Sequence, residues 1–305
     1  MTEYADEADY AAEPVSDAEK LAVAEHMLMS SPPGQFGDVL ADVRRLLPEG
    51  LLDDARAQLV AKKYNAQEGV IVEVGDHNSV LAQESEVAGG GFKDSLGGGV
   101  FAVDHVAAEI TGEGPEEAGG EVAPFDPAVE DMRLALEAGL EAYRVKHFSE
   151  AEKSAASVFA KGDGDGGGWL VAYVSARKYN LRNWWSGAWS GRYTVAIAEG
   201  SASVCGVITV RCHYFENGNI QLQTSKDVPT KAVEFSSPES LSQAVVSYIQ
   251  ESEGALHEGL EDMYESSDVT IRSMRRTKPI TAASFTWNVA KIRMRNTLTQ
   301  NSAGK

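Results

Sequence analysis

A single helical stretch near the C-terminal end sets the scale of the fold. Ser237 is a typical N-cap residue, Pro238 suits the first helical position, and small or apolar residues then recur at helical spacing. A helix from there to Arg276 would be about 58 Å long at 1.5 Å per residue, although Gly254 and Gly259 weaken it locally. A helix of this length needs a long surface to pack against. We therefore expect it to lie across a β-sheet that is wider than one chain supplies.

The segment before this helix carries the strands. Period-two alternation with β-branched and aromatic residues predicts strands over residues 155–160, 169–174, 193–198, 204–214 and 219–224. The Asn217-Gly218 pair predicts a tight hairpin between the last two strands, because both residue types tolerate positive φ. Strands joined by short turns form an antiparallel sheet.

Helices dominate the N-terminal part of the sequence. Ser16 and Glu19 form a capping box at the start of a first helix, and turns at 32–34 and 48–50 separate it from two further helices. Short helices with tight turns favour an antiparallel bundle. Strands follow at 70–74, 79–83 and 100–106, with glycine runs at 89–91 and 97–99 as loose turns. A further helix begins at Asp126-Pro127 and has one buried stripe, made of Met132, Leu136, Leu140 and Tyr143.

These patterns predict an α+β protein with six segments. They are an acidic disordered leader (1–15), a three-helix bundle (16–65), a small β region with glycine-rich turns and an acidic linker (66–124), a helix plus antiparallel sheet (125–235), a long helix (236–276) and a basic C-terminal segment (277–305).

The C-terminal end differs in charge from the rest of the chain. Residues 269–305 hold 8 of the 27 Lys and Arg residues and none of the 46 Asp and Glu residues, so they carry +8 and the remainder carries −27. The acidic body is unsuited to nucleic acid or an anionic membrane. The basic end favours an arm that binds an acidic partner, and a solvated, frayed end is the alternative. Trp287 and its apolar neighbours favour the arm, because disordered tails are poor in such side chains.

No pattern indicates an active site, a cofactor or a metal centre. Residues 163–168 (DGDGGG) begin like a calcium loop, but Val174 stands at the twelfth position, where a bidentate Glu is required. Cys205 and Cys212 are an odd number of residues apart in one predicted strand, so they lie on opposite faces and stay reduced. We therefore expect a protein that is not an enzyme.

The N-terminal residues and the hydropathy predict a cytoplasmic location. Residues 1–15 contain five acidic residues and no basic one, the opposite of a signal peptide. No apolar run approaches the roughly 20 residues that a transmembrane helix needs.

Several motifs resemble one known family. Residues 183–189 (NWWSGAW), followed by Tyr193, resemble the F-W-N-G-x-W-x-x-x-W signature of the alpha subunit of F-actin capping protein (CapZ). Residues 213–222 (HYFENGNIQL) are similar to that family's H-Y-Y-E-D-G-N-V-Q-L. The segment 32–36 (PPGQF) and, near the C-terminal end, Arg275-Arg276, 279–281 (PIT) and Trp287-Asn288 match in register. The order of motifs holds from Ser16 to about Ile292.

The resemblance implies a fold and a function. It implies a heterodimer with a capping protein beta subunit, an antiparallel sheet shared by both subunits, long helices packed across that sheet, and a basic C-terminal tentacle. The tentacles of such a dimer cap the barbed end of an actin filament, without calcium, in the actin cytoskeleton. Phosphoinositides and CARMIL-type peptides are candidate regulators. A chain that supplies half of a shared sheet should be unstable or insoluble alone, because its sheet edge stays open.

The resemblance also assigns roles to residues. The family's basic actin-binding positions match Arg272, Arg275 and Arg276, whereas two further basic positions fall on Ala282 and Ser284, and two aliphatic ones on Ala290 and Lys291. The predicted actin-binding residues are Arg272, Arg275, Arg276, Lys278, Trp287, Lys291, Arg293 and Arg295. Residues predicted for sheet packing or the subunit interface are Trp184, Trp185, Trp189, Tyr193 and Tyr214. The departures leave open a subunit with weakened capping, and the basic end leaves open a scaffold with a phosphoinositide-binding or nucleic-acid-binding tail.

Overall fold

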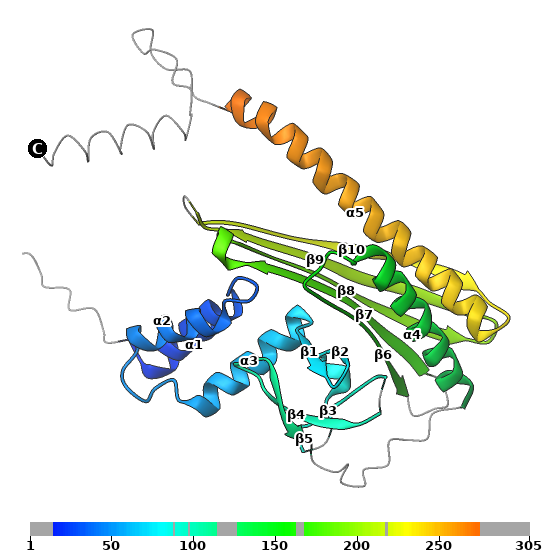
Figure 1. Ribbon diagram of the computed structural model, residues 1–305, viewed down its shortest axis with the longest axis horizontal. Coiled ribbons are helices and arrows are strands. Elements are labelled where there is room, and N and C mark those ends of the chain that lie inside the picture. Colours follow the sequence, from blue (N-terminus) through cyan, green and yellow to red (C-terminus); the bar gives the residue numbers. More distant parts are fainter. Residues whose placement is uncertain are drawn as a thin grey trace, which may run out of the picture. The chain divides into compact units, whose positions relative to one another are not determined.

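A five-stranded antiparallel sheet organises the chain (Figure 1). The computed structural model describes residues 15–87, 89–96, 98–114, 127–162, 168–216 and 219–274. The strand order is β10-β9-β8-β7-β6. The strands are β6 (Lys153–Gly162), β7 (Gly168–Asn180), β8 (Trp185–Ala198), β9 (Ser201–Tyr214) and β10 (Ile220–Glu234). The predicted antiparallel sheet is confirmed, although its strands are longer than the sequence pattern indicated.

Each face of this sheet is covered by a different part of the chain. On β9, Val204 and Ile208 are fully buried beneath helices, while Arg211 and His213 are buried on the opposite face. The helices of the first face are α4 (Pro127–His147) and the first part of α5 (Pro238–Met274). The N-terminal helices and a small hairpin cover the other face (Figure 1). Both faces of β7 are therefore buried over most of its length, and period-two alternation of burial is lost there.

The helical face has the contacts that its sequence predicts. Ser237 caps α5, because Ser240 donates its backbone N–H to the Ser237 hydroxyl over 3.2 Å. Gly139 lets α4 approach α5 closely, since a Cβ there would lie 2.3 Å from the Ser242 hydroxyl oxygen. Ser242 in turn donates to the carbonyl of Ala135 over 2.8 Å. The chain forms two units, Met1–Gly254 and Ala255–Lys305, and these α5 contacts belong to the first.

The N-terminal helices share one core with the small β region. They are α1 (Asp17–Met29), which begins with the predicted Ser16–Glu19 capping box, α2 (Phe36–Leu46) and α3 (Asp54–Glu68). Leu28, Leu40 and Tyr64 of these helices pack in one cluster with Val72 and Phe101. Two short sheets contribute to this region. One is the hairpin of β1 (Ile71–Val74) and β2 (His77–Val80), and the other has the order β3 (Phe92–Lys93), β4 (Val100–Asp104), β5 (Glu109–Glu113).

Two elements of the small β region differ from the sequence prediction. The strand expected at 79–83 ends at Val80, and residues Gln83–Ser85 form a 3-10 turn in which the Ser85 hydroxyl donates to the Ala82 carbonyl over 2.8 Å. Strand β5 lies in a stretch predicted in part as linker. Its side chains are mostly exposed, so its sequence carries no apolar alternation to detect. The leader before residue 15, the rest of the linker, the loop 163–167 and the Asn217-Gly218 turn lie outside the described residues.

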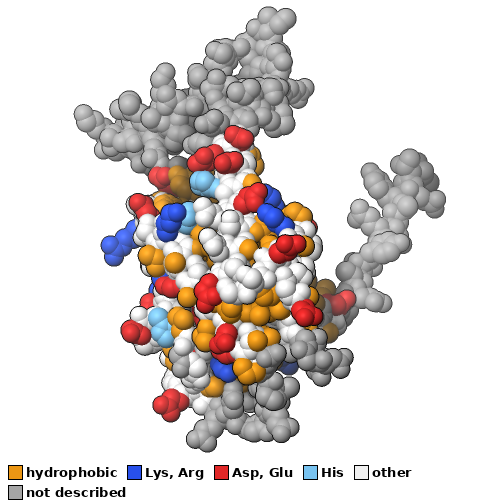
Figure 2. All heavy atoms as spheres, turned by 90° about the vertical axis from the view of Figure 1, so that its right-hand side faces the viewer, with side chains coloured by type: hydrophobic (Ala, Val, Ile, Leu, Met, Phe, Trp, Pro, Cys, Tyr) orange, Lys and Arg blue, Asp and Glu red, His pale blue; other side chains and the backbone are white. Residues whose placement is uncertain are grey.

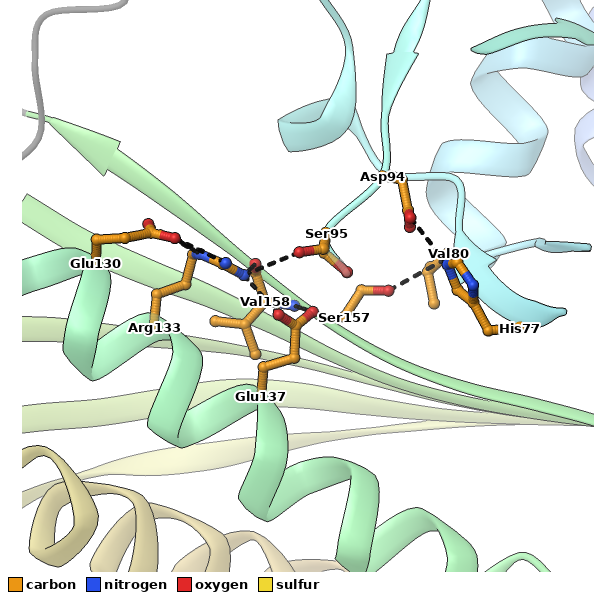
Figure 3. A network of polar contacts seen from close by, with 9 residues as sticks. All are labelled: His77, Val80, Asp94, Ser95, Glu130, Arg133, Glu137, Ser157 and Val158. Atoms are coloured by element: carbon orange, nitrogen blue, oxygen red, sulfur yellow. Dashed lines mark hydrogen bonds and ion pairs between the residues drawn. The ribbon is translucent and has the colours of Figure 1, made fainter. Parts of the chain in front are cut away.

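One arginine joins α4, the sheet and the small β region (Figure 3). Arg133 of α4 donates to the carboxylate of Glu130 (2.9 Å) and pairs with the buried carboxylate of Glu137. It also donates to the carbonyls of Ser95, in the loop after β3, and Val158, in β6, both at 3.2 Å. Because its guanidinium donates hydrogen bonds to α4, to the loop after β3 and to β6, Arg133 fixes the relative positions of these three segments.

Candidate functional site

The predicted actin-binding residues lie at and beyond the end of α5. Arg272 is in the last helical turn before Met274, and its side chain is not described. The others lie outside the described residues: Arg275, Arg276, Lys278, Trp287, Lys291, Arg293 and Arg295, with the departing positions Ala282, Ser284 and Ala290. The described structure therefore bears on how the helix that precedes these residues is anchored.

A buried carboxylate anchors the first part of α5. Glu253 is 3% exposed and accepts hydrogen bonds from Tyr143 of α4 (2.8 Å) and Tyr193 of β8 (2.6 Å). Burial raises the pKa of Glu253, and the two hydroxyl donors oppose that rise. Burial and the Glu253 charge also raise the pKa of each tyrosine, so both hydroxyls keep their protons as donors. Gly191 leaves room for this cluster, since a Cβ there would lie 2.9 Å from a Glu253 oxygen.

A second anchor ties α5 to strand β10. Tyr248 donates its hydroxyl to the carbonyl of Pro229 over 2.5 Å. Pro229 lies where the pairing of β10 with β9 shifts register between Val228 and Lys231. The Lys231 ammonium lies 4.5 Å from the centre of the Tyr248 ring and 3.2 Å from Glu251. The contacts of Tyr248 thus join α5 to β10 at this register shift.

The aromatic residues predicted for packing have different environments. Tyr193 is fully buried, Trp185 and Trp189 of β8 are half-buried, and Tyr214 of β9 is 38% exposed. Trp184 is 49% exposed, in the turn after β7, with a left-handed backbone (φ 66°). Its ring meets Phe215 edge-on at 5.6 Å between centroids, next to the β9–β10 hairpin. The role of Trp184 in sheet packing or at a subunit interface stays a prediction.

Strand β10 leaves one edge of the sheet open. It has 15 residues and pairs only with β9 among the described strands. Most of its side chains are exposed, Ile220 at 64% among them, whereas Leu222, Thr224 and Lys226 are half-buried and Val228 is buried on one face. An edge of this length presents a row of backbone donors and acceptors that another strand can pair with.

The described residues form neither a metal-ligand cluster nor a membrane-spanning helix. Among the described residues, no three His, Cys, Asp or Glu side chains gather where they could hold a metal ion. The described helices include none that is long and apolar enough to span a membrane. Acidic side chains are scattered over the face in Figure 2 among apolar and uncharged ones. Cys205 is half-buried and Cys212 exposed, and both are free thiols.

The sheet, its covering helices and the basic C-terminal end correspond to one known family. A sequence model of the family described as F-actin capping protein alpha subunit matches residues 24–297. The chain belongs to this family. The match includes the scaffold and most of the basic segment, so the resemblance in the motifs is confirmed.

Individual relatives of the capping protein alpha family align over most of the chain. The F-actin-capping protein subunit alpha of Dictyostelium discoideum is 29% identical over 281 residues, which are 90% of this chain and 96% of the relative. That of Caenorhabditis elegans is 27% identical over 284 residues, 91% and 96% of the two chains. The solved homodimeric actin capping protein alpha subunit from Plasmodium berghei has the same fold, with a TM-score of 0.70 at 21% identity over 87% of this chain and 99% of that one.

The sequence analysis did not predict several buried polar contacts of this capping protein alpha family member. Arg211 forms an ion pair with Glu68 at 2.8 Å, and both are almost fully buried. Gln35, beside α2, lies 2.7 Å from the imidazole of His213. Arg and Glu at such positions look like surface residues in a sequence. The sequence feature that could have indicated the Gln35–His213 contact is that these two residues lie within the motifs at 32–36 and 213–222.

Proposed function

We propose that this chain is the alpha subunit of an F-actin capping protein, which binds the barbed end of an actin filament and blocks subunit exchange there. The observation that carries the proposal is the family match over residues 24–297, which includes most of the basic C-terminal segment. Relatives that align with about nine-tenths of the chain bear the name F-actin-capping protein subunit alpha. The proposed location is the cytoplasmic actin cytoskeleton.

The proposed mechanism assigns two tasks to the C-terminal end. Arg272, Arg275 and Arg276 dock on an acidic surface of actin and speed encounter, helped by the other basic residues of the segment. The segment around Trp287 then packs on actin and slows release. The contacts of Glu253 and Tyr248 support this mechanism, because they fix the start of the helix that leads to these residues. No bond is made or broken, so the protein is not an enzyme.

The proposed partner is a capping protein beta subunit that extends the sheet at β10. The open 15-residue edge supports this pairing. A second copy of this chain is the alternative, since the related solved structure from Plasmodium berghei is of a homodimeric alpha subunit. Sedimentation of the full chain, alone and co-expressed with a beta subunit, distinguishes them: a stable dimer of the chain alone contradicts the heterodimer.

Capping is proposed to be independent of calcium. The acidic glycine-rich run at 163–168 lacks a Glu at its twelfth position, and Gly168–Asn180 is a strand rather than the helix that follows a calcium loop. Equal capping in the presence of calcium and of a chelator is the expected result.

The departures at Ala282, Ser284, Ala290 and Lys291 favour a second candidate, a dimer subunit with weakened capping. Filament elongation from seeds separates the two, because a weakened subunit stays dimeric but slows elongation only at high concentration. A phosphoinositide-binding tail would instead bind vesicles that contain phosphoinositide without any effect on filament ends, and CARMIL-type regulators can be tested once capping is measured.

Removal of the C-terminal segment tests the main proposal. A chain that ends at Asp268 loses all eight charges of the +8 segment and the last turn of α5. We expect the dimer to form normally while seeded actin elongation is no longer blocked. Deletion of residues 1–14, a truncation at the other end, is the control and should leave capping unchanged. Full capping by the Asp268 truncation would contradict the proposed mechanism.

A further inference from the structure

A small cavity lies between the N-terminal region and the sheet, away from α5. Its volume is about 320 Å³, near the lower limit of sites for small ligands. Its walls come from the start of α2, the end of α3, the loop after β4, and the sheet residues Lys153, Arg177 and Tyr179. The proposed capping mechanism uses none of these residues.

The first notable feature of this cavity is a buried positive charge. Arg177 is 6% exposed, and it donates to two neutral acceptors, the Tyr179 hydroxyl (2.7 Å) and the Glu68 carbonyl (3.0 Å). Its Nε has no hydrogen-bond partner, and no carboxylate of the described residues lies within 4.0 Å of its guanidinium. A guanidinium does not lose its proton, so its charge persists in this site. Burial of a charge without a counter-ion is costly.

The second feature is an uncapped helix end at the same cavity. Gly34, Phe36 and Gly37, at the start of the 11-residue helix α2, line it. The N-cap residue Gln35 makes no side-chain cap hydrogen bond, because its amide lies against His213. The first N–H groups of α2 therefore have no side-chain cap, and the helix dipole adds partial positive charge there, which the exposed Asp38 of the first turn offsets in part.

A third feature connects the buried arginine with the cavity. Tyr179 lies at the wall of the cavity, and its hydroxyl oxygen accepts from Arg177, which leaves the Tyr179 hydroxyl proton free to be donated to a ligand. The Tyr179 ring packs directly on Gly34, where φ is 76° and a Cβ would lie 2.9 Å from the ring. This close approach brings the hydroxyl to the start of α2.

We propose that this cavity binds a phosphate group. The start of α2 and the Tyr179 hydroxyl donate hydrogen bonds to the phosphate oxygens, and the Arg177 charge behind Tyr179 is neutralised. Burial lowers the pKa of His105 in the wall, so it is neutral at neutral pH and adds no charge. Lys153 is paired with Glu73 at 2.8 Å. The exposed Glu109 and Glu152 also line the cavity, and the Glu152 carboxylate accepts from the Tyr179 backbone N–H over 3.0 Å.

Titration of the full-length chain with inorganic phosphate, in the assembly in which it purifies and at constant ionic strength, tests the proposal. Calorimetry should show one saturable site. Gly37→Asp places a negative charge at the uncapped helix end, in a position where a Cβ meets no atom within 4 Å. It should weaken phosphate binding at least about tenfold, given the energy of two charges near a protein surface. Gly37→Asn has the same shape without the charge and should bind within about threefold of the natural chain.

Two further arms complete the test. Tyr179→Phe keeps the ring on Gly34 and removes the hydroxyl donor, so it should weaken phosphate binding about fivefold or more. Acetate, a carboxylate, should bind at least about tenfold more weakly than phosphate, because it offers fewer acceptor oxygens to the helix end. The proposal is overturned by the absence of saturable binding up to about 10 mM phosphate, by equal binding of the Gly37→Asp and Gly37→Asn variants, or by acetate binding as tightly as phosphate. Barbed-end capping is measured separately, so loss of one property leaves the other interpretable.

Discussion

His77 illustrates how a single residue makes the stability of this fold depend on pH. Its Nε2 lies 2.8 Å from the buried carboxylate of Asp94 (Figure 3). Its Nδ1 lies 3.3 Å from the carboxylate of Asp76. Burial lowers the pKa of His77, but hydrogen bonds to the two carboxylates and their charges outweigh it, so the pKa is raised overall. The protonated form is therefore the one that the folded state favours.

The consequence for stability follows from this direction. The stabilisation by His77 is complete below its unfolded pKa near 6.5 and is lost as the pH rises through the raised folded pKa. We expect His77→Gln to lower the free energy of unfolding more at pH of about 5.5 than at about 8.5, as measured by urea denaturation. His26→Gln, at an exposed position in α1, is the control. A His77 effect of equal size at both pH values would contradict this assignment.

Buried polar side chains are also the residues whose burial the sequence patterns did not predict. Tyr143 and Leu140 were predicted on the buried stripe of α4, and the structure confirms them. Glu137 and Glu253 are equally buried. Glu137 pairs with Arg133, one helical turn away, and accepts from the backbone N–H of Val158, whereas Glu253 is held by Tyr143 and Tyr193, both distant in sequence. A carboxylate on a helix is normally solvated, so no local pattern predicts its burial.

Among the elements, helices were predicted more completely than strands. Caps at Ser16 and Ser237 and the prolines beside the turns are local signals, and they mark the helix starts correctly. Strand ends were harder, because β7 and β8 continue through Arg177 and Ser186, which are buried on the face covered by α2 and α3. Burial of polar residues on that face depends on tertiary contacts that period-two alternation does not encode.

The junction of α3 with the sheet supports a prediction at this scale. Gly69 ends α3 with φ of 60°, and a Cβ there would lie 2.8 Å from the Ser175 hydroxyl oxygen and 2.9 Å from that of Ser190. In Gly69→Ala the new residue would therefore adopt a left-handed backbone conformation, and its side chain would clash with these two hydroxyl groups. Gly75→Ala is a matched control, because Gly75 has φ of 62° but nothing within 4 Å of a Cβ.

We expect Gly69→Ala to lower the free energy of unfolding by about 1–3 kcal/mol more than Gly75→Ala, because overpacking adds to the backbone cost that both share. Thermal or urea unfolding of the two variants measures the difference. An equal decrease in the free energy of unfolding of both variants would mean that α3 can shift on the sheet without loss of stability.

For the whole molecule, the separation of charge is the property most relevant to the proposed function. The last 37 residues carry +8 on a chain whose remainder carries −27, and the first part of α5 is held by buried contacts of Glu253 and Tyr248. The sequence alone established this separation, since counting charges needs no fold. It did not establish the anchors, because each involves residues from elements far apart in the chain.

Replacement of Arg272, Arg275 and Arg276 by Ala tests whether position or net charge matters for capping. If these arginines dock on actin, the rate of barbed-end capping should fall by about tenfold at low salt and become less dependent on salt. Replacement of the exposed Arg45, Arg56 and Arg182 by Ala changes the net charge equally and should leave the rate nearly unchanged. Seeded elongation of actin across a salt series measures both variants. Equal rates for the two would show that overall charge, rather than the position of the three arginines in the C-terminal part of the chain, governs encounter.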